Sequence, residues 1–127
     1  MSLAPTDYDF GDASNFFFAT TITCANDEAR AMYVEAYGHM LNYNHEQAIA
    51  CFTQCAELDP TCAMAYWGIA YCLSSSYNWA PGLGSGYDSI QLALANKDGC
   101  TELEIDLIDA LSLRHTKEAR DQMDPTV

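Results

Sequence analysis

The residues of this chain best suited to metal or redox chemistry are its six cysteines. Cys51 and Cys55 are four positions apart, a spacing that places both thiols on one face of a helix. With Cys62 and a histidine they form a candidate metal or redox site. The chain has no CxxC pair, which argues against zinc-ribbon and thioredoxin-type motifs. We expect no metal and no cofactor, with the cysteines acting as reduced, buried apolar residues. A metal-handling or redox role of Cys51, Cys55 and Cys62 is the alternative.

Acid–base catalysis would depend on three histidines. One of them, His39, follows Glu35 by about one helical turn, and we interpret this pair as a structural hydrogen bond. The serine run at 74–76 lacks the GxSxG context of a nucleophile. The glycine-rich stretch at 82–86 lacks the lysine of a phosphate-binding loop and a preceding strand. The sequence therefore predicts that the protein is not an enzyme.

The charge of the chain narrows the classes of partner. Its 127 residues include 18 acidic and five basic side chains, which gives a formal net charge of −13. Nucleic acids and anionic membranes are bound by clustered Lys and Arg, yet Arg30 is the only basic residue among the first 96. We expect no nucleic-acid partner and, because the apolar runs are too short to span a bilayer, no membrane partner. The start of the chain lacks the pattern of a secretory signal, so a cytoplasmic location is expected.

A repeat of 34 residues organises the chain. When residues 29–44 are placed over residues 63–78, six of the sixteen positions are identical. Thirty-four residues is the length of the helix–turn–helix unit in tetratricopeptide arrays. Half of the chain is hydrophobic, which is enough for the packed core of one domain. The identical pairs are Ala29 and Ala63, Ala31 and Ala65, Ala36 and Ala70, Tyr37 and Tyr71, Tyr43 and Tyr77, and Asn44 and Asn78.

Capping and helix-breaking residues divide the chain into helices that agree with this repeat. Asn and Thr are good N-caps because their side-chain oxygens accept hydrogen bonds from the first turn of a helix. Proline disfavours helix at the residue before it. The expected helices are 27–42 after an Asn26 cap, 45–58 between an Asn44 cap and Pro60, 63–73 after a Thr61 cap, 87–96, and one from 102 onward after a Thr101–Glu104 capping box.

The residues at the packing positions of this repeat resemble those of tetratricopeptide-repeat (TPR) proteins. Ala36, Ala48, Phe52 and Pro60 stand where that family has small, small, aromatic and proline residues. Over roughly residues 8–115 the chain is also similar to an uncharacterised group of longer TPR-domain proteins. The resemblance implies an all-α fold, a right-handed α-solenoid of helix–turn–helix units.

The same resemblance implies how the chain is divided. An extended N-terminal segment is expected at 1–25, and a first TPR unit at 26–60. A second unit follows at 61–99 with an expanded loop at 74–86, and residues 100–127 hold the first helix of a third unit and a polar tail. Because about three units are usually needed for stability, we expect either a fragment of a longer TPR protein or self-association through the face of the C-terminal helix.

In TPR arrays the first helices of the units line a concave groove. By helical spacing, this groove would be rich in aromatic and methionine side chains, which are typical of interaction hot spots. We expect a protein–protein interaction module that binds a partner peptide or helix there. The alternative is that these side chains pack against a neighbouring helix or against the N-terminal segment at 8–18. The expected partner-binding residues are Tyr33, Tyr37, Met40, Met64, Trp67 and Tyr71.

Overall fold

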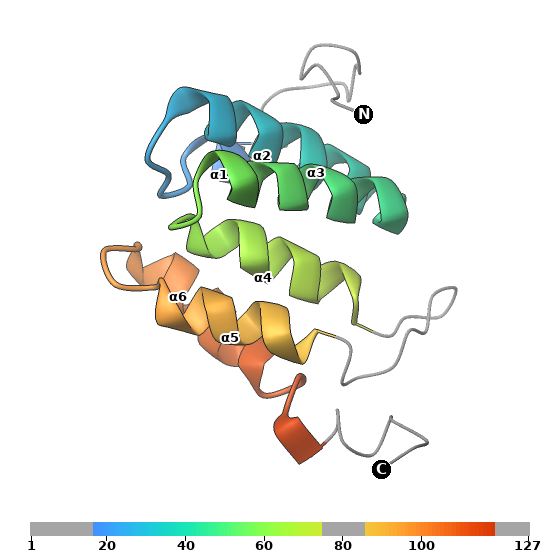
Figure 1. Ribbon diagram of the computed structural model, residues 1–127, viewed down its shortest axis with the longest axis vertical. Helices are drawn as coiled ribbons and strands as arrows, with labels where there is room; N and C mark the ends of the chain where they lie inside the picture. Colours follow the sequence, from blue (N-terminus) through green and yellow to red (C-terminus); the bar gives the residue numbers. More distant parts are fainter. Residues whose placement is uncertain (1–16, 75–85, 119–127) are drawn as a thin grey trace.

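The computed structural model describes residues 17–74 and 86–118, and all regular structure in these two ranges is helical (Figure 1). The all-α expectation is therefore confirmed for this part of the chain. Residues 1–16 of the N-terminal segment, most of the expanded loop and the end of the polar tail lie outside the described ranges. The helices are α1 (Phe17–Thr20), α2 (Asp27–Leu41), α3 (His45–Leu58), α4 (Ala63–Cys72), α5 (Tyr87–Ala95) and α6 (Glu102–Ser112).

Two of the predicted caps are present. The Asn26 side chain accepts a hydrogen bond from the Ala29 amide at 2.8 Å and so opens α2. Thr101 and Glu104 form the complete capping box at the start of α6, each side chain bonding to the backbone amide of the other. These caps bind amides of the first turn that have no partner within the helix.

The predicted cap of α4 is wrong. Cys62 occupies the cap position and makes no side-chain cap bond. Thr61 instead donates its hydroxyl and its backbone amide to Oδ1 of Asp59, at 2.6 and 3.0 Å. Because α4 begins at Ala63, Thr61 lies one residue before the cap position, and its hydroxyl donates to the charged carboxylate.

Successive helices pack side by side as stacked hairpins. α2 contacts α3, α3 contacts α4, and α4 contacts α5, while α4 also packs on both α2 and α6. Figure 1 shows the α2–α3 pair at one end and the α5–α6 pair at the other, with α4 between them. The approach of α3 to α4 depends on Gly68, because a Cβ at this position would lie 2.5 Å from the Phe52 ring.

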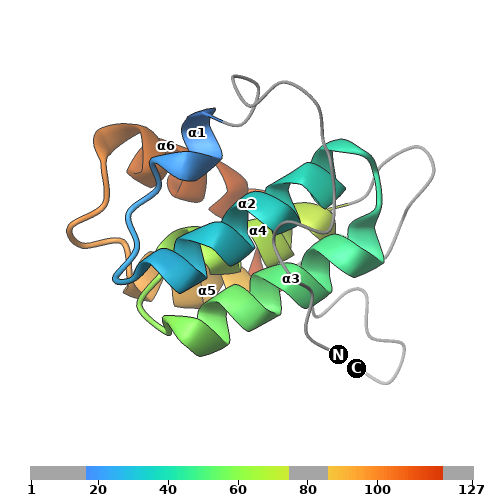
Figure 2. The same ribbon diagram turned by 90° about the horizontal axis from the view of Figure 1, so that it is seen from above.

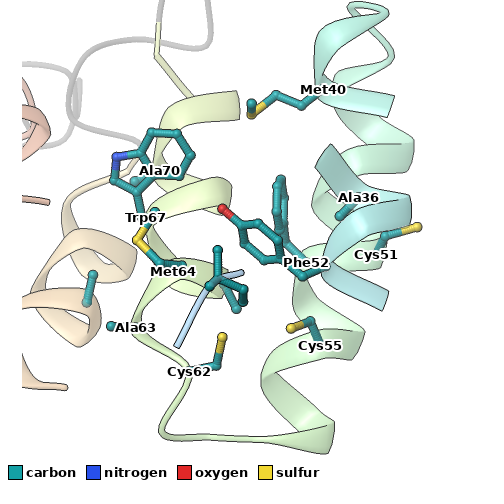
Figure 3. Close-up of a cluster of buried hydrophobic side chains, with 14 of the residues drawn as sticks. Ala36, Met40, Cys51, Phe52, Cys55, Cys62, Ala63, Met64, Trp67 and Ala70 are labelled. Atoms are coloured by element: carbon teal, nitrogen blue, oxygen red, sulfur yellow. The ribbon is translucent and has the colours of Figure 1, made fainter. Parts of the chain in front are cut away.

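One continuous apolar core runs through the stack (Figure 3). Phe52, Met64, Ile90 and Ile108 have no exposed surface, and they come from α3, α4, α5 and α6 in turn. Leu103 of α6 lies outside this core and is exposed. Of the helices in the described ranges, none has the length and apolar character needed to cross a membrane.

Candidate functional site

Most of the predicted groove residues belong to the core. Tyr33 and Met64 have no exposed surface, and Met40 and Trp67 are almost completely covered. Figure 3 shows Met40 pointing from α2 toward α4, with Met64 and Trp67 beside α4 in the same buried cluster. These four side chains therefore do not form an open surface, and the prediction that they contact a partner is corrected on that point.

The chain itself covers this face. We call residues 18–25 the strap; they comprise most of α1 and the segment that leads toward α2. Figure 2 shows α1 and α6 on the side of α2 that is turned away from α3. Ala19 and Ile22 of the strap are buried, and the Phe18 ring lies 5.8 Å from that of Tyr37. The described part of the N-terminal segment thus packs on the face where the groove was predicted, and it begins with a helical turn where an extended chain was expected.

Two buried carboxylates hold the strap in place. Glu104 of α6 accepts hydrogen bonds from the Thr23 amide at 2.8 Å and from the Thr23 hydroxyl at 2.6 Å. Asp59, at the end of α3, accepts one from the Ala25 amide at 2.7 Å. Burial alone would raise the pKa of the Asp59 carboxyl, but hydrogen bonds from Thr61 and Ala25 hold that pKa below its usual value.

Aromatic rings lead from the core to an exposed edge. The Tyr33 ring lies 5.2 Å from Phe52 and 6.2 Å from Tyr37, and Trp67 lies 5.2 Å from Tyr71. Burial and the neighbouring Tyr71 raise the pKa of Tyr37. Tyr71 is 45% exposed, so it is the member of the predicted set that offers a partner the most surface.

At that edge the groove remains open as a pocket with a volume of about 220 Å³. Its walls come from the C-terminal ends of α2, α4 and α6 and from the turn after α2. Met40 and Tyr71 are the predicted binding residues that line it. The full lining is Met40, Leu41, Tyr43, His45, Tyr71, Ser74, Leu111 and Arg114.

The rim of this end pocket is largely apolar and carries one cation. Leu41 is 47% exposed and Tyr43 is 80% exposed. The Tyr43 backbone has a positive φ of 59°, which ends α2 sharply and holds the ring at the rim. Arg114 belongs to the lining of the pocket and makes no ion pair with another described residue. Helical spacing also places Leu41 on the predicted groove face. Arg114 was not predicted as a site residue, because it follows the last expected helix and does not fit the aromatic pattern.

A serine and a histidine meet beside the pocket. Oγ of Ser74 lies 2.9 Å from Nε2 of the buried His115 and 3.2 Å from the Ala70 carbonyl oxygen. When the single hydroxyl proton is donated to that carbonyl, Nε2 of His115 must be the donor to Ser74. A general base would have to accept that proton instead. We interpret the contact as a structural link between the end of α4 and the segment after α6.

The predicted cysteine set is only partly brought together. Cys55 and Cys62 lie within hydrogen-bond reach of each other beside the α3–α4 turn, whereas Figure 3 shows the Cys51 sulfur pointing away from both. The Cys51 sulfur accepts a hydrogen bond from Nε2 of Gln47, at 3.9 Å. The structure instead brings Cys62 together with Cys24 and Asp59, whose ligand atoms all lie within 4.8 Å of one another. Cys24 and Asp59 were not predicted as ligands, because they are far apart in the sequence and only the path of the strap brings Cys24 next to Asp59.

The cysteines are all unpaired thiols. Burial, followed by the proximity of Cys62, raises the pKa of Cys24 to about 11. The hydrogen bond with Cys55 and then burial raise the pKa of Cys62 further. At neutral pH these thiols are therefore protonated unless a cation binds them.

The chain matches no protein-family model, no curated protein and no solved structure in comparisons of all three kinds.

Proposed function

We propose that this protein is an interaction module of TPR type, which binds a partner peptide in the end pocket. In this proposal α2–α3 and α4–α5 are two units of a right-handed solenoid, and α6 is the first helix of a third. The 34-residue repeat and the stacking of successive helices support it. The enzyme reading has less support, because the Ser74–His115 contact is explained as a structural link.

The observation that carries the proposal is an open apolar pocket at one end of a groove that the strap otherwise fills. Its volume of about 220 Å³ is below the 300–1,000 Å³ typical of small-molecule and cofactor sites. A space of that size suits one large apolar side chain of a peptide. Arg114, which makes no ion pair within residues 17–74 and 86–118, suits a carboxylate beside that side chain, either from an acidic residue or from a peptide C-terminus.

The chain offers a matched pair of variants for testing this. Leu41 lines the pocket and is 47% exposed, whereas Leu92 lies on α5 outside the pocket lining and is 48% exposed. We would select peptides from a random display library on the reduced protein and measure their affinities by fluorescence anisotropy. Leu41→Ala should weaken the selected peptides by about tenfold, since a buried leucine contact contributes about 1.5–3 kcal/mol. Leu92→Ala should leave the affinity unchanged.

Arg114 provides a second, chemically distinct readout. Arg114→Gln should lower the affinity for peptides that carry a carboxylate. It should not change the affinity for the same peptides after amidation of that group. Selected peptides that bind the Leu41→Ala protein as tightly as the original would overturn the proposed site. Equal losses for Leu41→Ala and Leu92→Ala would do the same.

A further inference from the structure

Two thiols and a carboxylate from distant parts of the chain converge behind the strap. Cys24 belongs to the strap, whereas Asp59 and Cys62 stand on either side of the turn from α3 to α4. Their ligand atoms lie within 4.8 Å of one another. Asp59 and Cys62 are buried and Cys24 is half-buried, so the strap forms one wall of the cluster.

The carboxylate of this cluster is held by groups around it. The Ala25 amide bonds to Oδ2 of Asp59, and the amide and hydroxyl of Thr61 bond to Oδ1. Outer hydrogen bonds of this kind orient metal-ligating carboxylates. The Cys24 thiol is also within hydrogen-bond reach of this carboxylate. Loss of that thiol proton frees a lone pair on the carboxylate and one on the sulfur, and both can then bind a cation.

Cys55 stands next to this cluster. Its thiol is within hydrogen-bond reach of Cys62 and lies 3.2 Å from the carbonyl oxygen of Ala29. Its sulfur is therefore a candidate fourth ligand for an ion held by the cluster. Figure 3 shows Cys55 and Cys62 at the same end of the core, beside the turn.

We propose that Cys24, Asp59 and Cys62 form a Zn²⁺ site, with Cys55 or water as the fourth ligand. A mixture of thiolate and carboxylate ligands suits zinc, whereas copper(I) selects sulfur ligands alone and magnesium and calcium select oxygen ligands alone. Zinc–sulfur bonds of about 2.3 Å and zinc–oxygen bonds of about 2.1 Å in a tetrahedron place the ligands roughly 3.5–3.8 Å apart. The cluster reaches that spacing by contracting by at most about 1 Å, and each coordinating cysteine releases its thiol proton to the solvent, two with water as the fourth ligand and three with Cys55.

Such an ion would join the strap to the body of the protein. Cys24 is anchored by its place in the strap, and the other two ligands are anchored by the α3–α4 turn. Zinc that binds the folded chain and not the unfolded one raises the melting temperature, and the rise continues with the logarithm of the free zinc concentration above its Kd. The site is separate from the end pocket, so its presence does not depend on peptide binding.

The test uses the full chain, freshly reduced and freed of metal. Zinc is titrated in competition with a chromogenic chelator, and Co²⁺ is used as a spectroscopic substitute. We expect the chain to bind one equivalent of zinc and its melting temperature to rise. With Co²⁺ we expect thiolate-to-cobalt charge-transfer bands and the visible absorption bands of a tetrahedral site. Cys24→Ser should weaken zinc binding by more than a hundredfold, whereas Thr61→Val, which removes one outer hydrogen bond, should weaken it by about 10–100-fold.

Cys51→Ala is the matched control, because Cys51 is a buried cysteine outside the cluster. It should retain full zinc affinity. Circular dichroism checks that each variant keeps its helices, and Cys24 is chosen because its partial exposure makes the serine replacement mild. Less than a tenth of an equivalent of zinc on the original chain would overturn the proposal. So would zinc binding that survives Cys24→Ser or is lost in Cys51→Ala.

Discussion

Glu104 of α6 accepts hydrogen bonds from both the amide and the hydroxyl of Thr23, a residue 81 positions earlier in the chain. The same carboxylate also accepts the Thr101 amide, so one buried side chain caps α6 and fastens the strap. Hydrogen bonds to charged acceptors contribute more to stability than neutral ones. The contact therefore connects the first described residues of the chain to one of its last helices.

We predict that Glu104→Gln lowers the free energy of unfolding by about 2–3 kcal/mol, because an amide NH₂ would then face a backbone N–H or hydroxyl that needs an acceptor. Urea denaturation measures the change. Glu102→Gln is the control, since Glu102 is an exposed residue of the same first turn and should change stability by less than about 0.5 kcal/mol. Equal effects of the two substitutions would contradict the role of the carboxylate in fastening the strap.

Loss of the hydroxyl from two different tyrosines should change the stability of the protein in opposite directions. The buried Tyr33 hydroxyl meets no hydrogen-bond partner among the described residues, so Tyr33→Phe should raise the free energy of unfolding by about 1 kcal/mol. The Tyr66 hydroxyl donates to the Pro60 carbonyl oxygen at 2.8 Å, so Tyr66→Phe should lower it by about 0.5–1 kcal/mol. Thermal melts of both variants decide this, and a destabilised Tyr33→Phe protein would show that its hydroxyl is bonded.

Gly68→Ala should destabilise the protein by about 1–3 kcal/mol, because the added methyl group meets the Phe52 ring at 2.5 Å. Phe52→Leu replaces that ring with a smaller side chain and should reduce the loss of stability caused by Gly68→Ala. A double-mutant cycle in urea should then give a coupling of at least about 1 kcal/mol between the two positions. Additive effects would mean that α3 and α4 separate freely at this contact.

The stability of the protein should fall as the solution is made mildly acidic. Burial lowers the pKa of the His39 imidazole below its usual value of about 6.5. Below that value the unfolded chain takes up a proton that the folded chain resists, so stability is complete above pH 6.5 and is lost as the pH falls. His39→Gln should reduce the slope of the free energy of unfolding between about pH 7.5 and pH 5.5. An unchanged slope would show that His39 does not titrate differently in the two states.

The helices could be predicted because their signals are local. Asn26 and the Thr101–Glu104 box act within one helical turn, and Pro60 acts on the residues directly before it. The predicted cap of α4 was wrong because Thr61 was chosen for its residue type alone. Its hydroxyl donates to Asp59, two residues earlier, and Cys62 occupies the cap position.

The candidate sites were harder to predict because their composition depends on contacts between distant segments. Helical spacing puts Tyr33 and Met64 on the faces of α2 and α4, but it does not reveal that the strap and α6 cover those faces. Of the residues expected to contact a partner, Met40 and Tyr71 line the open pocket because they lie at the ends of their helices, beyond the strap.

The amino-acid sequence by itself determined that the chain is helical, where most helices begin and end, and that half of its residues are apolar and available for a core. These properties follow from hydrogen bonds and periodicities within a few residues. Only the tertiary structure decided that the strap fills the groove, that Arg114 stands at an apolar pocket, and that Cys24 meets Asp59 and Cys62. Those contacts depend on the packing of helices far apart in the chain, which no local pattern specifies.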